Sequence, residues 1–334
     1  MADHSSGWNA LVERSAAIRF VDINLRGIGQ VMFQNNPLTG LLFLAGVTWG
    51  AVAGGHAVIA VSAVVATVIS TITAMLLRAD EKSLRTGLYG FNGVLVGCAV
   101  PTFVAAPNMW VLVVVGAAVS TVVMLAVTNV LKTWGVSALT FPFVLTTWFL
   151  VLAVYPFGDF TASGMGPQRF MQLAAGPGSN DAARGSLSLL DAWLKGPAQV
   201  FLVDNRISGI LMIIGLAVSS IWAGGLALVG AAIGVLVAYA LGASVADIDK
   251  GLYGYSAVLT AIAVGCTFYQ PNPRVLLFTL LGTVFTVITQ AGLNAALSPI
   301  GIPTFTAPFV FVTWLFLLPK ADLKPGSSAG NAPG

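Results

Sequence analysis

Three sequence motifs occur twice in this chain, and they occur in the same order each time. Leu, Gly, Gln, Val, Asn and Gly recur at matching places in the first motif. The copies are Leu25–Gly40 with Leu194–Gly209, Gly87–Leu95 with Gly251–Leu259, and Thr140–Trp148 with Thr306–Trp314. A duplication is the simplest explanation. We therefore expect two related halves, residues 1–170 and residues 171–334.

Long apolar segments carry most of each half. Of the 334 residues, 57% are hydrophobic and 8% are charged, whereas soluble domains carry roughly 25% charged residues. Several segments approach the roughly 20 residues that a helix needs to cross a hydrocarbon core of about 30 Å. They are 37–53, 56–77, 88–106, 109–131 and 136–156, then 207–223, 226–243, 252–270, 275–297 and 300–318. The sequence predicts an all-α polytopic membrane protein.

An amphipathic stretch precedes the apolar segments of each half, at about 20–34 and 187–205. These stretches are too short and polar to span a membrane alone, and both re-entrant and spanning placements stay open. Five spans per half would turn the second half upside down relative to the first. With both termini in the cytoplasm, Lys and Arg fall mostly on the cytoplasmic side, as the positive-inside rule requires. We therefore expect two inverted halves with a pore at their interface.

Four uncharged polar residues recur in the duplicated motifs: Gln30, Gln199, Thr140 and Thr306. A glutamine in a membrane helix often makes only a packing hydrogen bond, and a threonine often bonds back to its own helix. Because both copies keep the glutamine beside a glycine, we favour a pore-lining role for Gln30 and Gln199. The roles of the two threonines stay open between pore lining and back-bonding.

Large apolar side chains accompany these polar residues in the same motifs. They are Phe33, Phe91, Leu95, Leu202, Tyr255 and Leu259. Each could simply face lipid or the core. Beside a row of oxygens, they could instead form flat walls between which a planar solute slides, whereas a hydrated ion would lose its shell without compensation.

Ionisable groups lie at segment ends, so the spans offer no carboxylate or histidine for an ion site or proton relay. Asp22 and Asp191 are the exceptions, and capping or ion pairs with Arg26 and Lys195 would explain them. Cys98 and Cys266 lie in apolar segments and suggest neither a metal site nor a disulfide. No spacing fits an enzyme's nucleophile and base, no cofactor is indicated, and the net charge of +3 gives no footprint for nucleic acid.

The three duplicated motifs resemble those of the urea transporter family, which includes bacterial urea channels. The resemblance implies ten spans plus one re-entrant helix per half, and a homotrimer in the bacterial inner membrane with one pore per protomer. It implies further that glutamines serve the two mouths, apolar slots follow, and threonines form the constriction. By motif position these would be Gln30 and Gln199, then Phe33 with Leu95 and Leu202 with Leu259, and last Thr140 and Thr306.

We therefore expect a facilitative channel that passes urea down its gradient. Two alternatives remain: an ion-coupled secondary transporter of a small amide, and a general pore for small neutral solutes such as water or ammonia. The two copies are not identical, because Leu202 stands where the first copy has Phe33 and Arg206 stands where it has Pro37. The two mouths should therefore differ.

Overall fold

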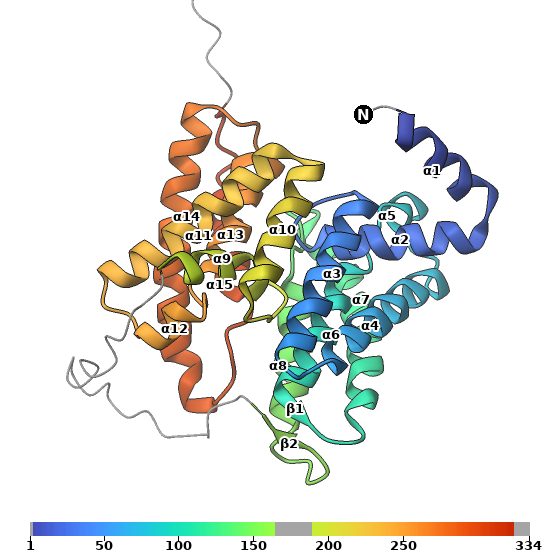
Figure 1. Cartoon of the computed structure of the whole chain (residues 1–334), viewed down its shortest axis with the longest axis horizontal. Helices are drawn as coiled ribbons and strands as arrows, with labels where there is room; N and C mark the ends of the chain where they lie inside the picture. Colours follow the sequence, from blue (N-terminus) through green and yellow to red (C-terminus); the bar gives the residue numbers. More distant parts are fainter. Residues whose placement is uncertain (1–2, 164–188, 324–334) are drawn as a thin grey trace, which may run out of the picture.

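The computed structural model describes residues 3–163 and 189–323, and in this part the fold is almost entirely helical (Figure 1). The first half contains α1 (Asp3–Arg14), α2 (Ala16–Gln30), α3 (Pro37–Ala53), α4 (Val58–Leu76), α5 (Glu81–Arg85), α6 (Phe91–Phe103), α7 (Met109–Leu131) and α8 (Phe141–Ala153). Two antiparallel two-residue strands, β1 (Val104–Ala105) and β2 (Thr161–Ala162), close its lower end. The expected boundary between residues 170 and 171 lies outside the described residues.

The second half follows the same order of elements. It contains α9 (Leu189–Gln199), α10 (Arg206–Ser219), α11 (Ile221–Ala240), α12 (Val245–Asp249), α13 (Gly254–Ile262), a π-helical turn (Ala263–Thr267), α14 (Pro273–Leu297), a 3₁₀ turn (Ser298–Ile300) and α15 (Ala307–Leu317). In Figure 1 the elements of the first half gather on the right and those of the second half on the left.

Each of the ten predicted apolar segments contains a helix. In the described part, four helices are long and apolar enough to cross a membrane: α4, α7, α11, and α14 with its 3₁₀ extension. The others are shorter; α6 and α8, with 13 residues each, span only about 20 Å at 1.5 Å per residue. One predicted boundary was wrong. The break expected between 223 and 226 lies at Ser220, whose extended backbone and side chain cap α11.

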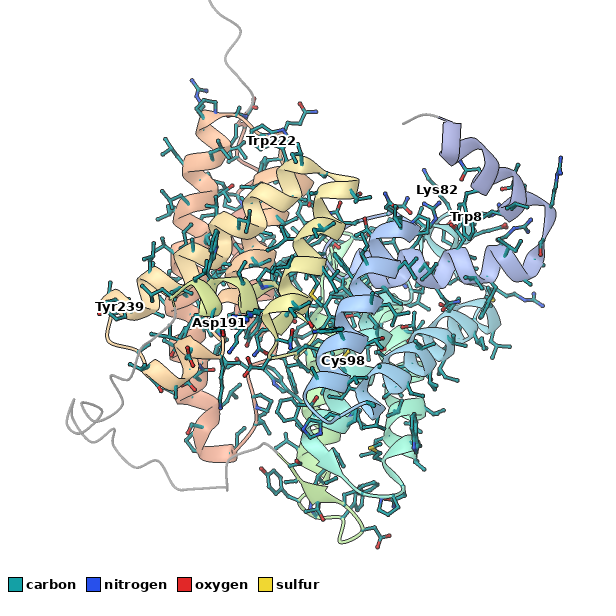
Figure 2. The ribbon with its side chains drawn as sticks, viewed as in Figure 1. Trp8, Lys82, Cys98, Asp191, Trp222 and Tyr239 are labelled. Carbon is teal, nitrogen blue, oxygen red and sulfur yellow. The ribbon has the colours of Figure 1, made fainter. Side chains whose placement is uncertain are left out.

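The surface is apolar, whereas small polar side chains lie inside. Exposed residues include Leu236, Leu277 and Leu281, and Trp222 and Tyr239 lie at the periphery (Figure 2). Buried polar residues are mostly Ser and Thr, and Asp22 is the one charged residue that is buried in the described part. This distribution suits a lipid solvent, in which exposed side chains need no hydrogen bonds but backbone groups do.

The duplicated motifs share unusual backbone conformations. Phe33 and its counterpart Leu202 have positive φ angles of 65° and 61°, and Leu139 and Phe305, which each precede a motif threonine, have 52° and 46°. Such angles are uncommon for residues other than glycine. The duplication therefore extends from the sequence to the local backbone.

The halves meet along matched helices. Thr39 on α3 donates a hydrogen bond to the carbonyl of Gly215 on α10 (2.7 Å), and Ser208 on α10 donates one to the carbonyl of Gly46 on α3 (2.7 Å). These two helices lie next to each other at the boundary in Figure 1. In the same reciprocal way, Trp148 donates to Pro303 O (3.0 Å) and Trp314 donates to Ser137 O (2.8 Å).

Candidate functional site

Two short helices, α2 and α9, present the motif glutamines. Helix α2 starts at Ser15, whose side chain accepts from the Ile18 N–H. It can lie close against α3 because Gly40 has no side chain: a Cβ there would lie 1.8 Å from the Leu25 carbonyl oxygen. Gly209 gives α9 the same access, with a Cβ distance of 1.7 Å to the Leu194 oxygen. Glycine at these positions therefore allows the close helix packing that positions α2 and α9, and with them the two glutamines.

Both glutamines make the same hydrogen bond. Gln30 Nε2 donates to Thr86 O (3.0 Å), and Gln199 Nε2 donates to Lys250 O (2.7 Å). Thr86 and Lys250 are the residues that end the short helices α5 and α12, where backbone carbonyls lack a partner within the helix. The packing hydrogen bond considered from the sequence is therefore present. It uses only the amide nitrogen, and neither Oε1 has a hydrogen-bond partner among the described residues.

The position of Thr86 depends in turn on a capped helix. Asp80 caps α5 by accepting from the Ser83 N–H (2.8 Å). Hydrogen bonds from Ser83, together with the charge of Lys82, hold the pKa of the Asp80 carboxyl below its ordinary value. Asp80 is therefore ionised at neutral pH and keeps the cap, so α5 offers the Gln30 amide a fixed carbonyl.

The motif threonines of the two halves touch each other. Thr140 Oγ1 and Thr306 Oγ1 lie 2.6 Å apart, and both residues are 2% exposed. Each threonine is the residue just before a helix, α8 or α15, and neither hydroxyl bonds back to its own helix in the described structure. Back-bonding, one alternative from the sequence, is not what the structure has. The pair is a buried polar contact between the halves.

A cavity of about 210 Å³ brings four of the ten sequence-predicted residues together. These are Gln30, Phe33, Phe91 and Thr140. The space holds several water molecules, and its walls mix amide and hydroxyl groups with aromatic rings. Phe33 and Leu139, both with positive φ, also line it. Strained backbone of this kind concentrates at functional sites, because surrounding structure must hold it in place.

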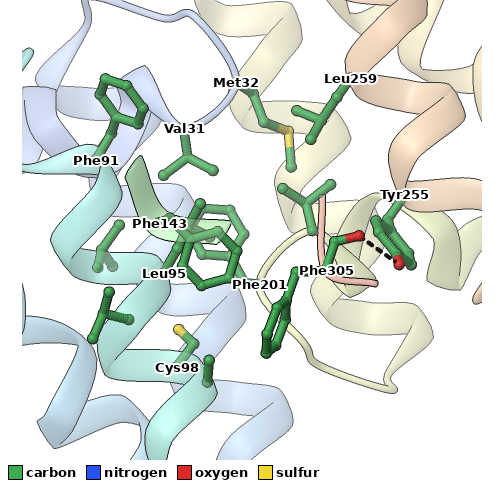
Figure 3. Packing of buried hydrophobic residues seen from close by; sticks show 14 of the residues in the cluster. Val31, Met32, Phe91, Leu95, Cys98, Phe143, Phe201, Tyr255, Leu259 and Phe305 are labelled. Atoms are coloured by element: carbon green, nitrogen blue, oxygen red, sulfur yellow. Dashed lines mark hydrogen bonds between the residues drawn. The ribbon is translucent and has the colours of Figure 1, made fainter. Parts of the chain in front are cut away.

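The remaining predicted residues lie elsewhere in the interior. Leu95 and Leu259 are fully buried (Figure 3). The Tyr255 hydroxyl donates to Phe305 O (2.9 Å) and lies 3.2 Å from Thr304 Oγ1. Gln199, Leu202 and Thr306 do not line the 210 Å³ cavity, although Thr306 touches Thr140 at its edge.

Comparison with known proteins shows which family this chain belongs to. The family model described as "Urea transporter" matches residues 21–321. The chain belongs to the urea transporter family. It is 30% identical over 318 residues to Urea transporter 1 of Ovis aries, and equally similar to the proteins of that name from Rattus norvegicus and Mus musculus. Each of these matches covers 93% of this chain and 79% of the relative.

Membership in the urea transporter family makes the chain an integral membrane transport protein and not an enzyme. The match covers both copies of all three motifs. It therefore supports the resemblance on which the sequence interpretation rested.

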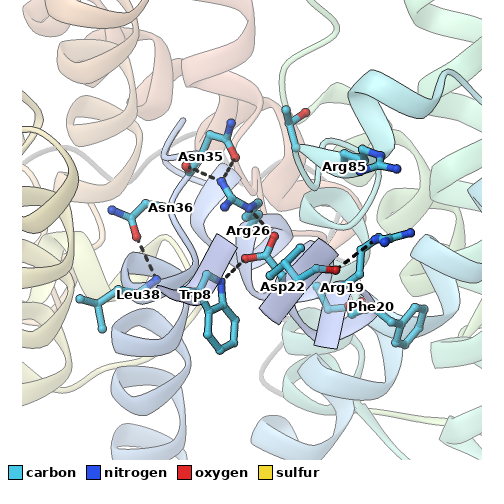
Figure 4. Close-up of polar contacts among 12 residues, drawn as sticks. Trp8, Arg19, Phe20, Asp22, Arg26, Asn35, Asn36, Leu38 and Arg85 are labelled. Carbon is cyan, nitrogen blue, oxygen red and sulfur yellow. Dashed lines mark hydrogen bonds and ion pairs between the residues drawn. The ribbon is translucent and has the colours of Figure 1, made fainter. Parts of the chain in front are cut away.

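The charged residues near the glutamines of this urea transporter family member form ion pairs. Asp22 Oδ2 accepts from Arg26 Nε at 2.6 Å, and Asp22 Oδ1 accepts from Trp8 Nε1 at 2.7 Å (Figure 4). In the second half Asp191 (Figure 2) lies 3.2 Å from Lys195 Nζ. The ion pairs expected from the sequence are confirmed. Both carboxylates therefore have a basic partner on their own helix.

Sequence reasoning missed six residues that also line the cavity. They are Val31, Leu88, Ser137, Leu139, Thr267 and Phe268. Four of them lie inside or just before the duplicated motifs, so motif position could have found them. Thr267 and Phe268 lie in no motif. They arrive from the second half through the π-helical turn, which the sequence pattern did not reveal.

Proposed function

We propose that this protein is a passive channel that moves urea across the membrane down its concentration gradient. The observation that carries this proposal is the cavity whose lining combines the Gln30 amide and the Thr140 hydroxyl with the rings of Phe33 and Phe91. Such a surface offers hydrogen-bond acceptors to the edge of a solute and apolar contact to its faces. The relatives named Urea transporter 1 support urea as the solute.

Urea matches this chemistry because it is neutral and planar, with one acceptor oxygen and four N–H donors. The Gln30 amide nitrogen is held by Thr86 O, so its oxygen is fixed in orientation before a solute arrives. A solute N–H that leaves water can bond first to this oxygen and next to the Thr140 hydroxyl. Exchange of one hydrogen bond for another avoids the cost of an unpaired buried polar group, about 1–3 kcal/mol.

The other parts of the pathway follow from the duplication. We assign Gln199 to the opposite mouth and Leu202 with Leu259 to a second apolar slot. We assign Thr140 and Thr306 to the constriction at the centre. In this arrangement, Leu95 backs the slot at Phe33, and Tyr255 braces the second slot. The architecture proposed around this pathway is five spans plus a re-entrant helix in each inverted half, in a homotrimer with one pore per protomer. The membrane is the bacterial inner membrane, with both termini in the cytoplasm.

Urea flux into proteoliposomes tests this proposal. Purified protein is reconstituted, and the permeation of urea, thiourea, water and ammonia is measured in one preparation beside protein-free liposomes. We expect urea to enter faster than in protein-free liposomes, with water and ammonia increased less. Equal urea entry with and without protein would refute the proposal, and a larger increase for water or ammonia would favour a general pore.

A further inference from the structure

A π-helical turn, Ala263–Thr267, follows α13 and directly precedes the exposed residue Phe268. The Phe268 N–H bonds to Ala263 O at 2.9 Å, which closes the five-residue step of a π turn. Such turns are rare, and they occur frequently at functional sites because they shift the direction of the side chains that follow. Here the turn delivers Thr267 and Phe268 to the cavity that contains Gln30.

The first half has no counterpart of this turn. Because the π turn adds one residue, Thr102 and Phe103 stand where the second half has Thr267 and Phe268: the sequences are Val-Pro-Thr-Phe and Val-Gly-Cys-Thr-Phe. Helix α6 stays α-helical to Phe103. The Thr102 hydroxyl donates to Cys98 O at 2.8 Å, and Phe103 is buried and packs edge-on against Phe305 (5.6 Å between ring centres). The first half therefore bonds or buries the two side chains that the second half exposes to the cavity.

Phe268 meets the cavity wall from the other half. Its ring centre lies 5.9 Å from that of Phe33, with an angle of 77° between the planes, and 38% of the residue is exposed. Phe33 also packs edge-on against Phe309, at 6.0 Å. Phe33 thus contacts one buried ring, Phe309, and one exposed ring, Phe268.

We propose that Thr267 and Phe268 are specificity-determining residues at the Gln30 mouth, a role that rests on the proposed urea channel. Phe268 limits the thickness and width of a solute that can pass Phe33. The Thr267 hydroxyl offers a hydrogen bond to the solute before it reaches Gln30. Because the matching side chains of the first half are bonded within their own helix, as Thr102 is, or buried, as Phe103 is, this selection acts at one mouth only.

Substitution of each residue tests the inference by the ratio of two fluxes. Urea and N-methylurea uptake are measured with wild type, Phe268→Ala and Thr267→Val in the same liposomes. Phe268→Ala should raise the ratio of N-methylurea to urea flux about 2–10-fold, the range expected for loss of one aromatic contact. Thr267→Val should lower urea flux about 2–10-fold, as for one lost hydrogen bond.

Two matched controls lie on α14, away from the cavity. Phe285 is a similarly exposed phenylalanine, and Thr289 is a half-buried threonine whose hydroxyl donates to Phe285 O. Phe285→Ala and Thr289→Val should keep the wild-type flux and ratio. If Phe268→Ala fails to assemble, Phe268→Leu, which lacks a ring, should raise the ratio in the same direction.

The outcomes separate this inference from the proposed function. If wild type moves urea but the flux and the ratio of both cavity variants stay at the wild-type level, only the role of Thr267 and Phe268 is overturned. Control variants that change the ratio as much as Phe268→Ala would overturn it too. Wild type that does not move urea would overturn the channel function, and this inference with it.

Discussion

The contact between Thr140 and Thr306 makes a prediction in which stability and transport respond differently. Each hydroxyl is buried, and the other threonine is its one hydrogen-bond partner in the described structure, at 2.6 Å. Thr→Val keeps the shape of the side chain but removes the hydroxyl. A single substitution therefore leaves one buried hydroxyl unpaired, whereas the double substitution leaves none.

The magnitudes follow from this count of unpaired groups. An unpaired buried polar group costs about 1–3 kcal/mol, whereas replacing both partners by apolar groups is nearly neutral. Thr140→Val and Thr306→Val should each lower the free energy of unfolding by about 1–3 kcal/mol, and the double variant by less than the sum. Transport should follow the opposite order. The double variant offers no hydroxyl to urea at the constriction, so its flux should fall about 5–150-fold, which corresponds to about 1–3 kcal/mol.

Two assays on the same preparations check this prediction. Denaturation in detergent compares the stability of wild type, both single variants and the double variant, and urea uptake into proteoliposomes compares their flux. We expect the double variant to be more stable than at least one single variant and slower than both in transport. Wild-type urea flux in the double variant would show that the hydroxyls do not contact the solute.

Three further predictions concern the glutamines, the helix contacts and the ion pairs. Gln30→Ala and Gln199→Ala should each lower urea flux about 2–12-fold, as for loss of one hydrogen bond, while size-exclusion chromatography shows an intact oligomer. Unchanged flux in both variants would mean that the glutamines only pack. Gly40→Ala would place a Cβ 1.8 Å from a backbone oxygen of α2, so it should lower the melting temperature. Gly225 has open space around it, so the control Gly225→Ala should not lower it. Equal melting temperatures would contradict the close approach of α2 and α3. Asp22→Asn removes the charge that pairs with the arginine and should destabilise the protein by about 1–3 kcal/mol. This is less than for a fully buried pair, because the arginine stays partly exposed. Wild-type stability of the variant in a denaturation assay would refute a stabilising role for the ion pair.

Much of the helical architecture could be predicted because it depends on local pattern. Apolar length located the ten segments, and charge at i and i+4 located the pair of Asp22 with Arg26. The duplication singled out Gln30 and Gln199, which make equivalent hydrogen bonds in the structure. These features need only residues close in sequence or the comparison of one half with the other.

The rest depends on contacts that no local pattern encodes. Thr140 and Thr306 are 166 residues apart, so motif position indicated that they correspond but not that they touch. The π-helical turn that brings Phe268 against Phe33 is one extra residue in an otherwise helical segment, and hydropathy does not distinguish it from the helix before it. At Ser220, an uncharged cap inside a long apolar stretch ended one helix and began another, and hydropathy alone moved that boundary by several residues.

The central claim is that urea moves passively, without a coupling ion. Its most direct test is urea uptake into proteoliposomes with and without an imposed proton or sodium gradient. The structure pairs Asp22 with Arg26 and Asp191 with Lys195, so we expect the same initial rate of uptake under all conditions, with urea reaching equal concentrations inside and outside. Accumulation of urea above the outside concentration when either gradient is imposed would contradict the account.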